Sequence, residues 1–278
     1  ISSPLGISVE EAAEAIIRVA NAKMAGAIRL ISIERGHDPK RFAAMPFGGG
    51  GALHAGALVR EIGLAAAIVP RFPGVNSALG CVMSDLRHDE VRTLNRMLDT
   101  LDCEALTAMI AEITASSEEV IKRSKASIDC LEAVIELDML YLGQTHAVAA
   151  PVPVSDNEIT TEAIRAAFDA SYRRTFGRLL ENIPVRVLNL RLSVIGKRPE
   201  VDIASLARGE RAASADDCHL ADQKIFAGGQ WHDGAIIDRL RLPAGAVVNG
   251  PCLLVQPDAT IYVDPGLAAR VDDIGNII

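Results

Sequence analysis

The stretch that decides the fold runs from Phe47 to Gly63 and reads FGGGGALHAGALVREIG. Between two apolar segments it places four consecutive glycines: Gly48, Gly49, Gly50 and Gly51. Glycine loses more backbone entropy on folding than any other residue, so such a run predicts a tight turn or a close approach to the backbone. We therefore expect at least one of these glycines to have a positive φ.

The segments around the glycines predict a strand, a loop, a helix and a second strand. RFAAMPF (41–47) and LAAAIVP (64–70) read as short buried strands, and ALHAGALVREI (52–62) reads as a helix closed by Gly63. A crossover of this kind is almost always right-handed and leaves its two strands parallel. The first ninety residues are therefore expected to be α/β.

A long amphipathic helix precedes this unit, and a helix of small residues follows it. Ser8 and Glu11 have the spacing of a capping box, and apolar residues recur at helical spacing until about Glu34, where Gly36 provides a stop. GVNSALGCVMSDL (74–86) is the second helix. Apolar residues of the first helix occupy more than one face, so we expect exposed surface there and a two-fold homodimer.

The rest of the chain changes character twice. We expect a polar helix over 102–128, two strands around Gly143 and Gln144 (130–143 and 145–154), a helix over 160–176 and a strand over 185–196. The predicted parts are a partial nucleotide-binding lobe (1–90), an α+β domain of β-β-α-β order (91–198), a linker (199–222) and a small all-β C-terminal unit (223–278).

Composition excludes several classes of function. The 278 residues carry a net charge of -8 with no Lys/Arg block, which argues against nucleic-acid binding. No apolar run reaches the roughly 18 residues of a membrane helix, and no signal peptide is recognisable. The five cysteines are scattered, which favours reduced thiols in a cytoplasmic protein.

The glycine loop leaves two readings open. Free N–H groups at the start of a helix form a site for a phosphate or for the polar edge of a nucleotide, whereas a tight turn for packing needs no ligand. A P-loop is excluded because Ala52 follows Gly51, and the G-x-G-x-x-G fingerprint is also absent. His54 is expected one turn into the helix, where it either reaches a phosphate or is a surface histidine.

The other histidines give no catalytic pattern. His88 stands between Asp85 and Asp89, where a charged strand edge is favoured over a metal site. His146 and His219 lie far apart in sequence from each other and from His232. The residues predict no metal site and leave the catalytic residues unknown.

Five segments together resemble the A subunit of N-methylhydantoinases and its relatives, the 5-oxoprolinases and the acetone and acetophenone carboxylases. They are SVEEAAEAIIRVANAKMAGAIRLISIERGHDP, FGGGGALHA, PGVNSALGCVMSDLRHDEVRT, YLGQTHAV and GPCLLVQPDATIYVDPG. They span nearly the whole chain in the family's order.

The resemblance implies part of the second lobe of an actin-like ATPase fold. ATP and Mg²⁺ would be the cofactors, with Gly48 to Gly51 along the nucleotide and His54 nearby. The family opens a cyclic amide, or carboxylates a ketone, after phosphorylating an oxygen of the substrate. A B-type subunit, or a fused second half of the protein, normally completes the reaction.

Two departures from the family pattern affect what the chain is expected to do alone. The usual Gly-Gly-Ala-Gly-Pro-Leu-His-Ala has Gly50 in place of alanine and Ala52 in place of proline, which predicts a looser loop. The Asp-x-Gly-Gly-Thr motif of the first lobe is absent, so we expect the C-terminal portion of a longer protein, inactive without its N-terminal lobe. A cyclic-amide hydrolase is the favoured function; a ketone carboxylase subunit and a non-catalytic subunit-interaction module are the alternatives.

Overall fold

The computed structural model describes residues 1–152, 159–207 and 209–278. The end of the strand predicted over 145–154 and one position of the linker predicted over 199–222 lie outside the described residues.

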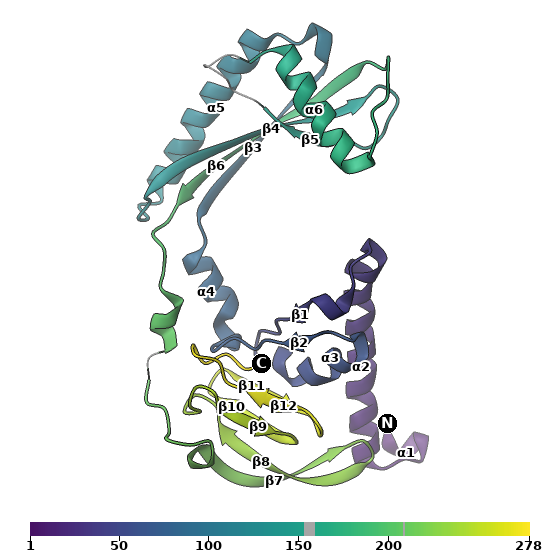
Figure 1. The fold of residues 1–278 in the computed structure, drawn as a ribbon, viewed down its shortest axis with the longest axis vertical. Helices are drawn as coiled ribbons and strands as arrows, with labels where there is room; N and C mark the ends of the chain where they lie inside the picture. Colours follow the sequence, from purple (N-terminus) through teal and green to yellow (C-terminus); the bar gives the residue numbers. More distant parts are fainter. Residues whose placement is uncertain (153–158, 208) are drawn as a thin grey trace. The chain divides into compact units, whose positions relative to one another are not determined.

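The described chain forms two compact units. Residues 1–82 join residues 201–278 in one, here called the split unit, and residues 83–200 form the other, the central unit (Figure 1). This division differs from the four successive parts expected from the sequence, because the first and last segments of the chain share one core.

The split unit opens with a short helix, α1 (Ser2–Leu5), followed by the long helix α2 (Val9–Ile31). The predicted capping box is confirmed: the Ser8 hydroxyl accepts from the Glu11 amide at 3.1 Å, and the Glu11 carboxylate accepts from the Ser8 amide at 2.8 Å. These bonds hold the pKa of Glu11 below its usual range. Two 3₁₀ helices (Ile33–Arg35 and Pro39–Arg41) follow α2, with Gly36 left-handed between them.

The expected strand–loop–helix–strand unit is present in shortened form. β1 (Ala43–Ala44) and β2 (Ala66–Ala67) pair in parallel, as predicted. The helix between them is divided into a 3₁₀ turn (Gly51–His54) and α3 (Ala55–Ile62), which ends at the left-handed Gly63. A further 3₁₀ turn (Pro73–Val75) leads into α4 (Asn76–Met83).

Six strands complete the split unit. Their bounds are β7 (His219–Ala227), β8 (Gln230–Asp238), β9 (Val247–Asn249), β10 (Cys252–Gln256), β11 (Ala259–Val263) and β12 (Ala268–Arg270). Four form a sheet of order β11-β10-β8-β7, and β12 pairs with β9. A 3₁₀ turn (Asp216–Cys218) and the start of β7 fall inside the predicted linker, which explains why a boundary at residue 223 does not describe the fold.

Long-range contacts join the two segments of the split unit. Val69, just after β2, exchanges backbone hydrogen bonds of 2.7 and 2.9 Å with Ile277. Ala52 and Val69 are buried in the same hydrophobic cluster as Leu254 and Ile261 of the C-terminal strands. The C-terminal strands therefore complete the core of the N-terminal segment.

A buried arginine strengthens this junction. Arg239 is 3% exposed, and its guanidinium donates to the backbone carbonyls of Val69, Pro70, Arg71 and Gly275. Burial lowers the pKa of Arg239 to about 10. A charge removed from water is tolerated when hydrogen bonds replace its hydration, and here carbonyls from both segments of the chain do so.

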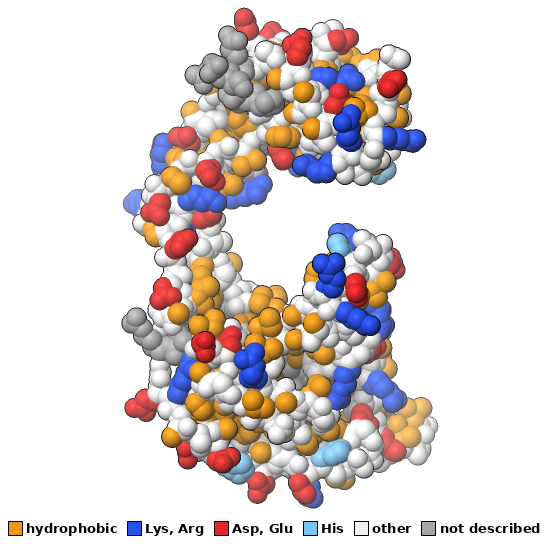
Figure 2. Space-filling view, viewed as in Figure 1, with side chains coloured by type: hydrophobic (Ala, Val, Ile, Leu, Met, Phe, Trp, Pro, Cys, Tyr) orange, Lys and Arg blue, Asp and Glu red, His pale blue; other side chains and the backbone are white. Residues whose placement is uncertain are grey.

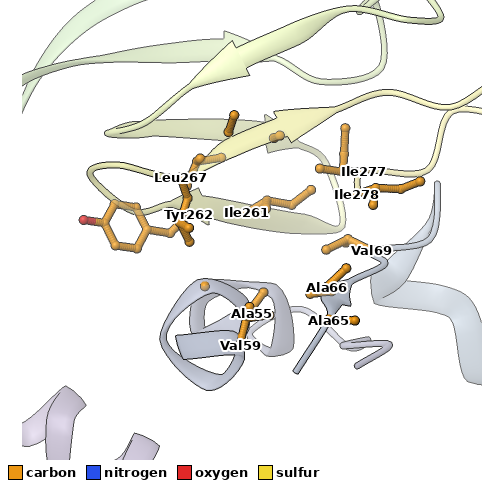
Figure 3. A pocket seen from close by; sticks show the side chains of 15 residues that line it. Ala55, Val59, Ala65, Ala66, Val69, Ile261, Tyr262, Leu267, Ile277 and Ile278 are labelled. Carbon is orange, nitrogen blue, oxygen red and sulfur yellow. The ribbon is translucent and has the colours of Figure 1, made fainter. Parts of the chain in front are cut away.

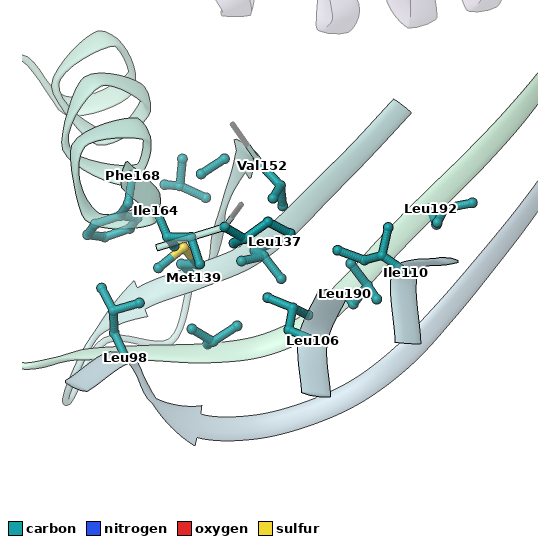
Figure 4. Packing of buried hydrophobic residues seen from close by; sticks show 14 of the residues in the cluster. Leu98, Leu106, Ile110, Leu137, Met139, Val152, Ile164, Phe168, Leu190 and Leu192 are labelled. Atoms are coloured by element: carbon teal, nitrogen blue, oxygen red, sulfur yellow. The ribbon is translucent and has the colours of Figure 1, made fainter. Parts of the chain in front are cut away.

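The central unit is a four-stranded antiparallel sheet of order β3-β6-β4-β5. Its elements are β3 (Leu86–Met97), a 3₁₀ turn (Leu98–Thr100), α5 (Cys103–Arg123), β4 (Cys130–Tyr141), β5 (Val148–Pro151), α6 (Thr161–Phe176) and β6 (Val185–Lys197). A further 3₁₀ turn (Ile203–Ala207) follows in the split unit. Both helices share one core with the sheet, formed by residues such as Leu106, Phe168, Leu137 and Leu190 (Figure 4). The α+β class is as expected.

The predicted order β-β-α-β omitted the strand β3. In the structure β3 comes first, and the observed order is β-α-β-β-α-β. Its sequence, LRHDEVRTLNRM, is mostly charged or polar because β3 lies at the edge of the sheet. The sequence predicted only a charged strand edge around His88, and this prediction is confirmed. A half-covered edge strand buries few side chains, so its apolar pattern is weak.

Candidate functional site

The glycine loop turns the chain from β1 toward α3. Gly48 has φ of 81°, which confirms the expected positive φ, and its amide donates to the Pro73 carbonyl at 2.7 Å. Among the hydrogen bonds of the described residues, none uses the amides of Gly49, Gly50 or Gly51. Three adjacent amides thus remain free ahead of the helix.

Part of the glycine content is explained by the chain's own packing. Gly74 faces Asp258, in the turn between β10 and β11; the Gly74 amide donates to the Asp258 carboxylate at 2.9 Å, and a side chain at Gly74 would collide with that turn. A Cβ on Gly49 would lie 3.6 Å from the Asp258 carbonyl oxygen. Gly50, in contrast, has no atom within 4 Å of its Cβ position, so that side of the loop is open.

The open side of the loop suits an anionic group. Free amides and absent side chains form a cradle for phosphate oxygens, and the positive end of α3 adds a favourable field. The residues present therefore fit the triphosphate of a nucleotide. The described residues contain no group of three or more His, Cys, Asp or Glu that could hold a metal ion.

His54 lies at the junction of the 3₁₀ turn and α3, rather than one turn into a helix as expected. Its Nδ1 is 2.7 Å from Oδ1 of Asn21, a residue of α2 that is only 7% exposed. The hydrogen bond joins the 3₁₀ turn before α3 to α2 and fixes the orientation of the ring.

A groove of about 1330 Å³ lies within the split unit, beside His54. Its walls are α2, the start of α3 and the hairpin of β7 and β8, whose tip is held to α2 by bonds from the amides of Gly228 and Gly229 to the carboxylate of Glu14. Trp231, the chain's one tryptophan, lines the groove and is 56% exposed.

Two buried polar groups of β11 and its following turn also line the groove. The Tyr262 hydroxyl and Oδ2 of Asp264 are buried without a hydrogen-bond partner among the described residues. Burial raises the pKa of Tyr262 to about 12 and raises the pKa of Asp264, which Arg60 opposes from 3.8 Å. Sequence reasoning missed this pair, although the polar YVD within an apolar C-terminal run was a signal.

A second, smaller hollow is apolar. It measures about 310 Å³ and lies between α3, the segment around β2 and the strands β11 and β12 (Figure 3). Ala55, Val59, Val69 and Ile261 surround it, and the Tyr262 ring stands at one end with its hydroxyl directed away (Figure 3). Orange side chains are also exposed over the C-terminal strands in Figure 2. This hollow offers no polar group suited to chemistry.

The remaining predicted residues do not join the site. His88 lies 3.6 Å from Glu90, Asp89 accepts from Ser193 and Arg87, and Asp85 accepts from Lys197. These ion pairs and hydrogen bonds support the charged strand edge. None of the five cysteines is in a disulfide, and none of the helices in the described part of the chain has the length and hydropathy of a membrane span.

Comparison with known protein families gives matches over nearly the whole chain. The model described as hydantoinase/oxoprolinase matches residues 1–90, and the model of the hydantoinase/oxoprolinase C-terminal domain matches residues 96–275.

Individual relatives are longer than this chain. Caprolactamase subunit alpha of Pseudomonas jessenii is 30% identical over 276 residues, which is 98% of this chain but 40% of that protein. The crystal structure of ATP-dependent caprolactamase from the same organism matches with a TM-score of 0.67 and 29% identity over 100% of this chain and 41% of that one. Nucleotide-free acetone carboxylase matches with a TM-score of 0.80 at 23% identity, over 100% of this chain and 41% of that one, a likeness in fold.

Proposed function

Since the chain belongs to the hydantoinase/oxoprolinase family, we propose that it forms part of an ATP-dependent enzyme that opens a cyclic amide after phosphorylating the amide oxygen. The 30% identity with caprolactamase subunit alpha favours the cyclic amide over the ketone carboxylation of other relatives. Phosphorylation converts a poor leaving oxygen into a good one, so that water can attack the ring carbon.

The observation that carries the nucleotide part of this proposal is the open face of the glycine loop. The amides of Gly49, Gly50 and Gly51 have no partner among the described residues, and no atom lies within 4 Å of the Cβ position of Gly50. We propose that Gly48 and these three glycines hold the phosphates, as in an actin-like second lobe over residues 1–90. His54 follows three residues later, close enough in sequence to act on the same substrate complex.

The proposal includes partners outside this chain. We infer an N-terminal lobe that supplies the rest of the nucleotide site, and a B-type subunit that completes hydrolysis. Two facts support this inference. The chain spans about 40% of the length of caprolactamase subunit alpha, and the name of that relative describes it as a subunit. A cytoplasmic location is part of the proposal, since ATP is the intended cofactor.

The test uses the chain assembled with these partners and a panel of substrates: caprolactam, 5-oxoproline, hydantoin, and acetone with bicarbonate. ADP release that depends on a cyclic amide and matches the amount of ring-opened product is expected. ADP release that requires acetone and bicarbonate instead would contradict the cyclic-amide assignment and favour the carboxylase.

A further inference from the structure

The hydrogen bond between His54 and Asn21 determines which nitrogen of the imidazole is left as an acceptor in the groove that both residues line. Oδ1 of Asn21 is an acceptor, so Nδ1 of His54 must donate its proton across the 2.7 Å separation. A neutral imidazole carries one proton, and with that proton on Nδ1 the lone pair lies on Nε2. In the described residues, no hydrogen bond to Nε2 is present.

Asn21 is buried at the contact between α2 and α3. It lies on the face of α2 that packs against α3, and it is buried beside the apolar contacts of Ala25 with Leu58 and Ile62. Arg29 adds a hydrogen bond from α2 to the Glu61 carbonyl of α3. Turning the amide so that its NH₂ group faced Nδ1 would place a donor where Oδ1 now accepts, and the hydrogen bond would then require the other tautomer of His54.

We propose that Asn21 is a positioning residue that keeps His54 in the Nδ1–H tautomer, so that Nε2 accepts a proton from an N–H or O–H group of a ligand in the groove. The proposal rests on the proposed function for the identity of that ligand, a cyclic amide. There the amide N–H bond breaks, the proton moves to Nε2, and the electron pair remains on the amide and increases the negative charge on its oxygen. That oxygen is the atom to be phosphorylated.

The imidazolium formed by this transfer stays in place. Its Nδ1–H bond to Asn21 is unchanged, and the new proton on Nε2 points back to the site from which it came. The ring therefore returns the proton without reorienting. A positioned base of this kind contributes roughly 10² to 10⁴ in rate.

The test is a ¹⁵N NMR measurement of histidine tautomers in the 278-residue chain at a pH where imidazoles are neutral. The signals of His54 are identified by their loss in His54→Gln. We expect Nδ1 to be protonated and Nε2 unprotonated. His232 is an internal control with the opposite tautomer, because its Nε2 donates to the Ala227 carbonyl at 3.0 Å.

Variants of Asn21 decide whether this residue is the cause. Asn21→Asp keeps an acceptor and should keep the Nδ1–H tautomer, whereas Asn21→Leu should shift His54 toward Nε2–H. Should Asn21→Leu fail to fold, Asn21→Ala gives the same readout. An Nε2–H tautomer in the unmodified chain, or no change on losing the acceptor, would overturn the proposal.

A kinetic measurement separates this inference from the proposed function. In the assembled enzyme, Asn21→Leu should lower kcat for the cyclic amide by roughly tenfold or more, with Asn21→Asp less affected. Loss of the Nδ1–H tautomer without any change in kcat would also overturn it. A wild-type Nδ1–H tautomer in an enzyme that shows no ATP-dependent turnover would refute the proposed function and leave the geometry intact.

Discussion

At the scale of single residues, the buried carboxyl group of Asp264 in the groove lowers the stability of the folded state when it is ionised. Burial raises the pKa of Asp264, and Arg60, at 3.8 Å, recovers only part of the cost. A raised pKa means that the folded state binds the proton more tightly than the unfolded chain. The stabilising contribution is therefore complete below the pKa of the unfolded chain and is lost as the pH rises through the folded pKa.

Replacing Asp264 by asparagine should remove the loss of stability that accompanies ionisation of this carboxyl group. We expect Asp264→Asn to be more stable than the wild type at pH 7, by on the order of 1 kcal/mol, and to flatten the pH dependence between mildly acidic and neutral pH. Denaturant unfolding at several pH values measures both effects. Lower stability of the variant at pH 7, with the pH slope unchanged, would show that Arg60 outweighs burial.

Individual residues also show which structural features can be predicted from a sequence. The capping box of Ser8 and Glu11, and a positive φ at one or more of the glycines Gly48 to Gly51, were predictable because each depends on local geometry. The bond from His54 to Asn21 joins residues 33 positions apart, and no local pattern encodes it. For Asp264 the sequence offered a signal, the polar YVD in an apolar run, but its burial depends on Gly56 of α3, which is far away in sequence.

At the scale of elements, α3 can pack closely against the turn after β11 because Gly56 has no side chain. A Cβ at Gly56 would collide with Oδ2 of Asp264 and lie 2.8 Å from the Leu267 side chain. Arg60, one turn later on α3, donates to the Pro265 carbonyl in the same turn. The approach of α3 to this turn therefore depends on Gly56.

Two glycine-to-alanine variants should change stability in opposite directions. Gly56→Ala should destabilise the chain by roughly 1–3 kcal/mol because the close contact must open. Gly26→Ala, on the exposed side of α2 with no atom within 4 Å, should stabilise it by about 0.5–1 kcal/mol. Thermal unfolding compares the pair; a harmless Gly56→Ala would mean that Asp264 moves aside freely.

The helix α2 presents an uncovered apolar stripe. Ile16, Val19 and Leu30 are 52%, 57% and 57% exposed, as expected from the sequence, while Met24 and Ile28 pack toward α3. Ala20 and Ala27 lie on the same face as Ile16 and allow a second helix to approach closely. We predict a two-fold dimer through α2 in the 278-residue chain, because a stripe of this kind is rarely left in water.

Sedimentation equilibrium at micromolar concentration measures this association. The double variant Ile16→Glu with Leu30→Glu should be monomeric. Val120→Glu, which replaces an exposed apolar residue of α5 in the central unit, should leave the dimer unchanged. A monomeric wild type would contradict the prediction.

At the scale of the whole molecule, prediction from sequence succeeded where neighbours in sequence are neighbours in space. The parallel pairing of β1 with β2 and the α+β class of the central unit were of this kind. The joining of residues 1–82 with 201–278 was not, because it depends on contacts such as Val69 with Ile277 and on the Arg239 guanidinium. The edge strand β3 was missed because its charges conceal the alternation of a buried strand.

The central claim is that the open glycine loop holds the nucleotide of a cyclic-amide hydrolase. Gly50 offers the most direct test: its φ of -105° and ψ of -12° are accessible to other residues, and no atom lies within 4 Å of its Cβ position. Gly50→Leu should therefore fold normally while filling the place of the phosphates. The measurement is ADP released per ring opened by the chain assembled with its N-terminal lobe and B-type subunit. We predict equal amounts for the wild type and loss of both products in Gly50→Leu at unchanged melting temperature; wild-type turnover by Gly50→Leu would contradict the account.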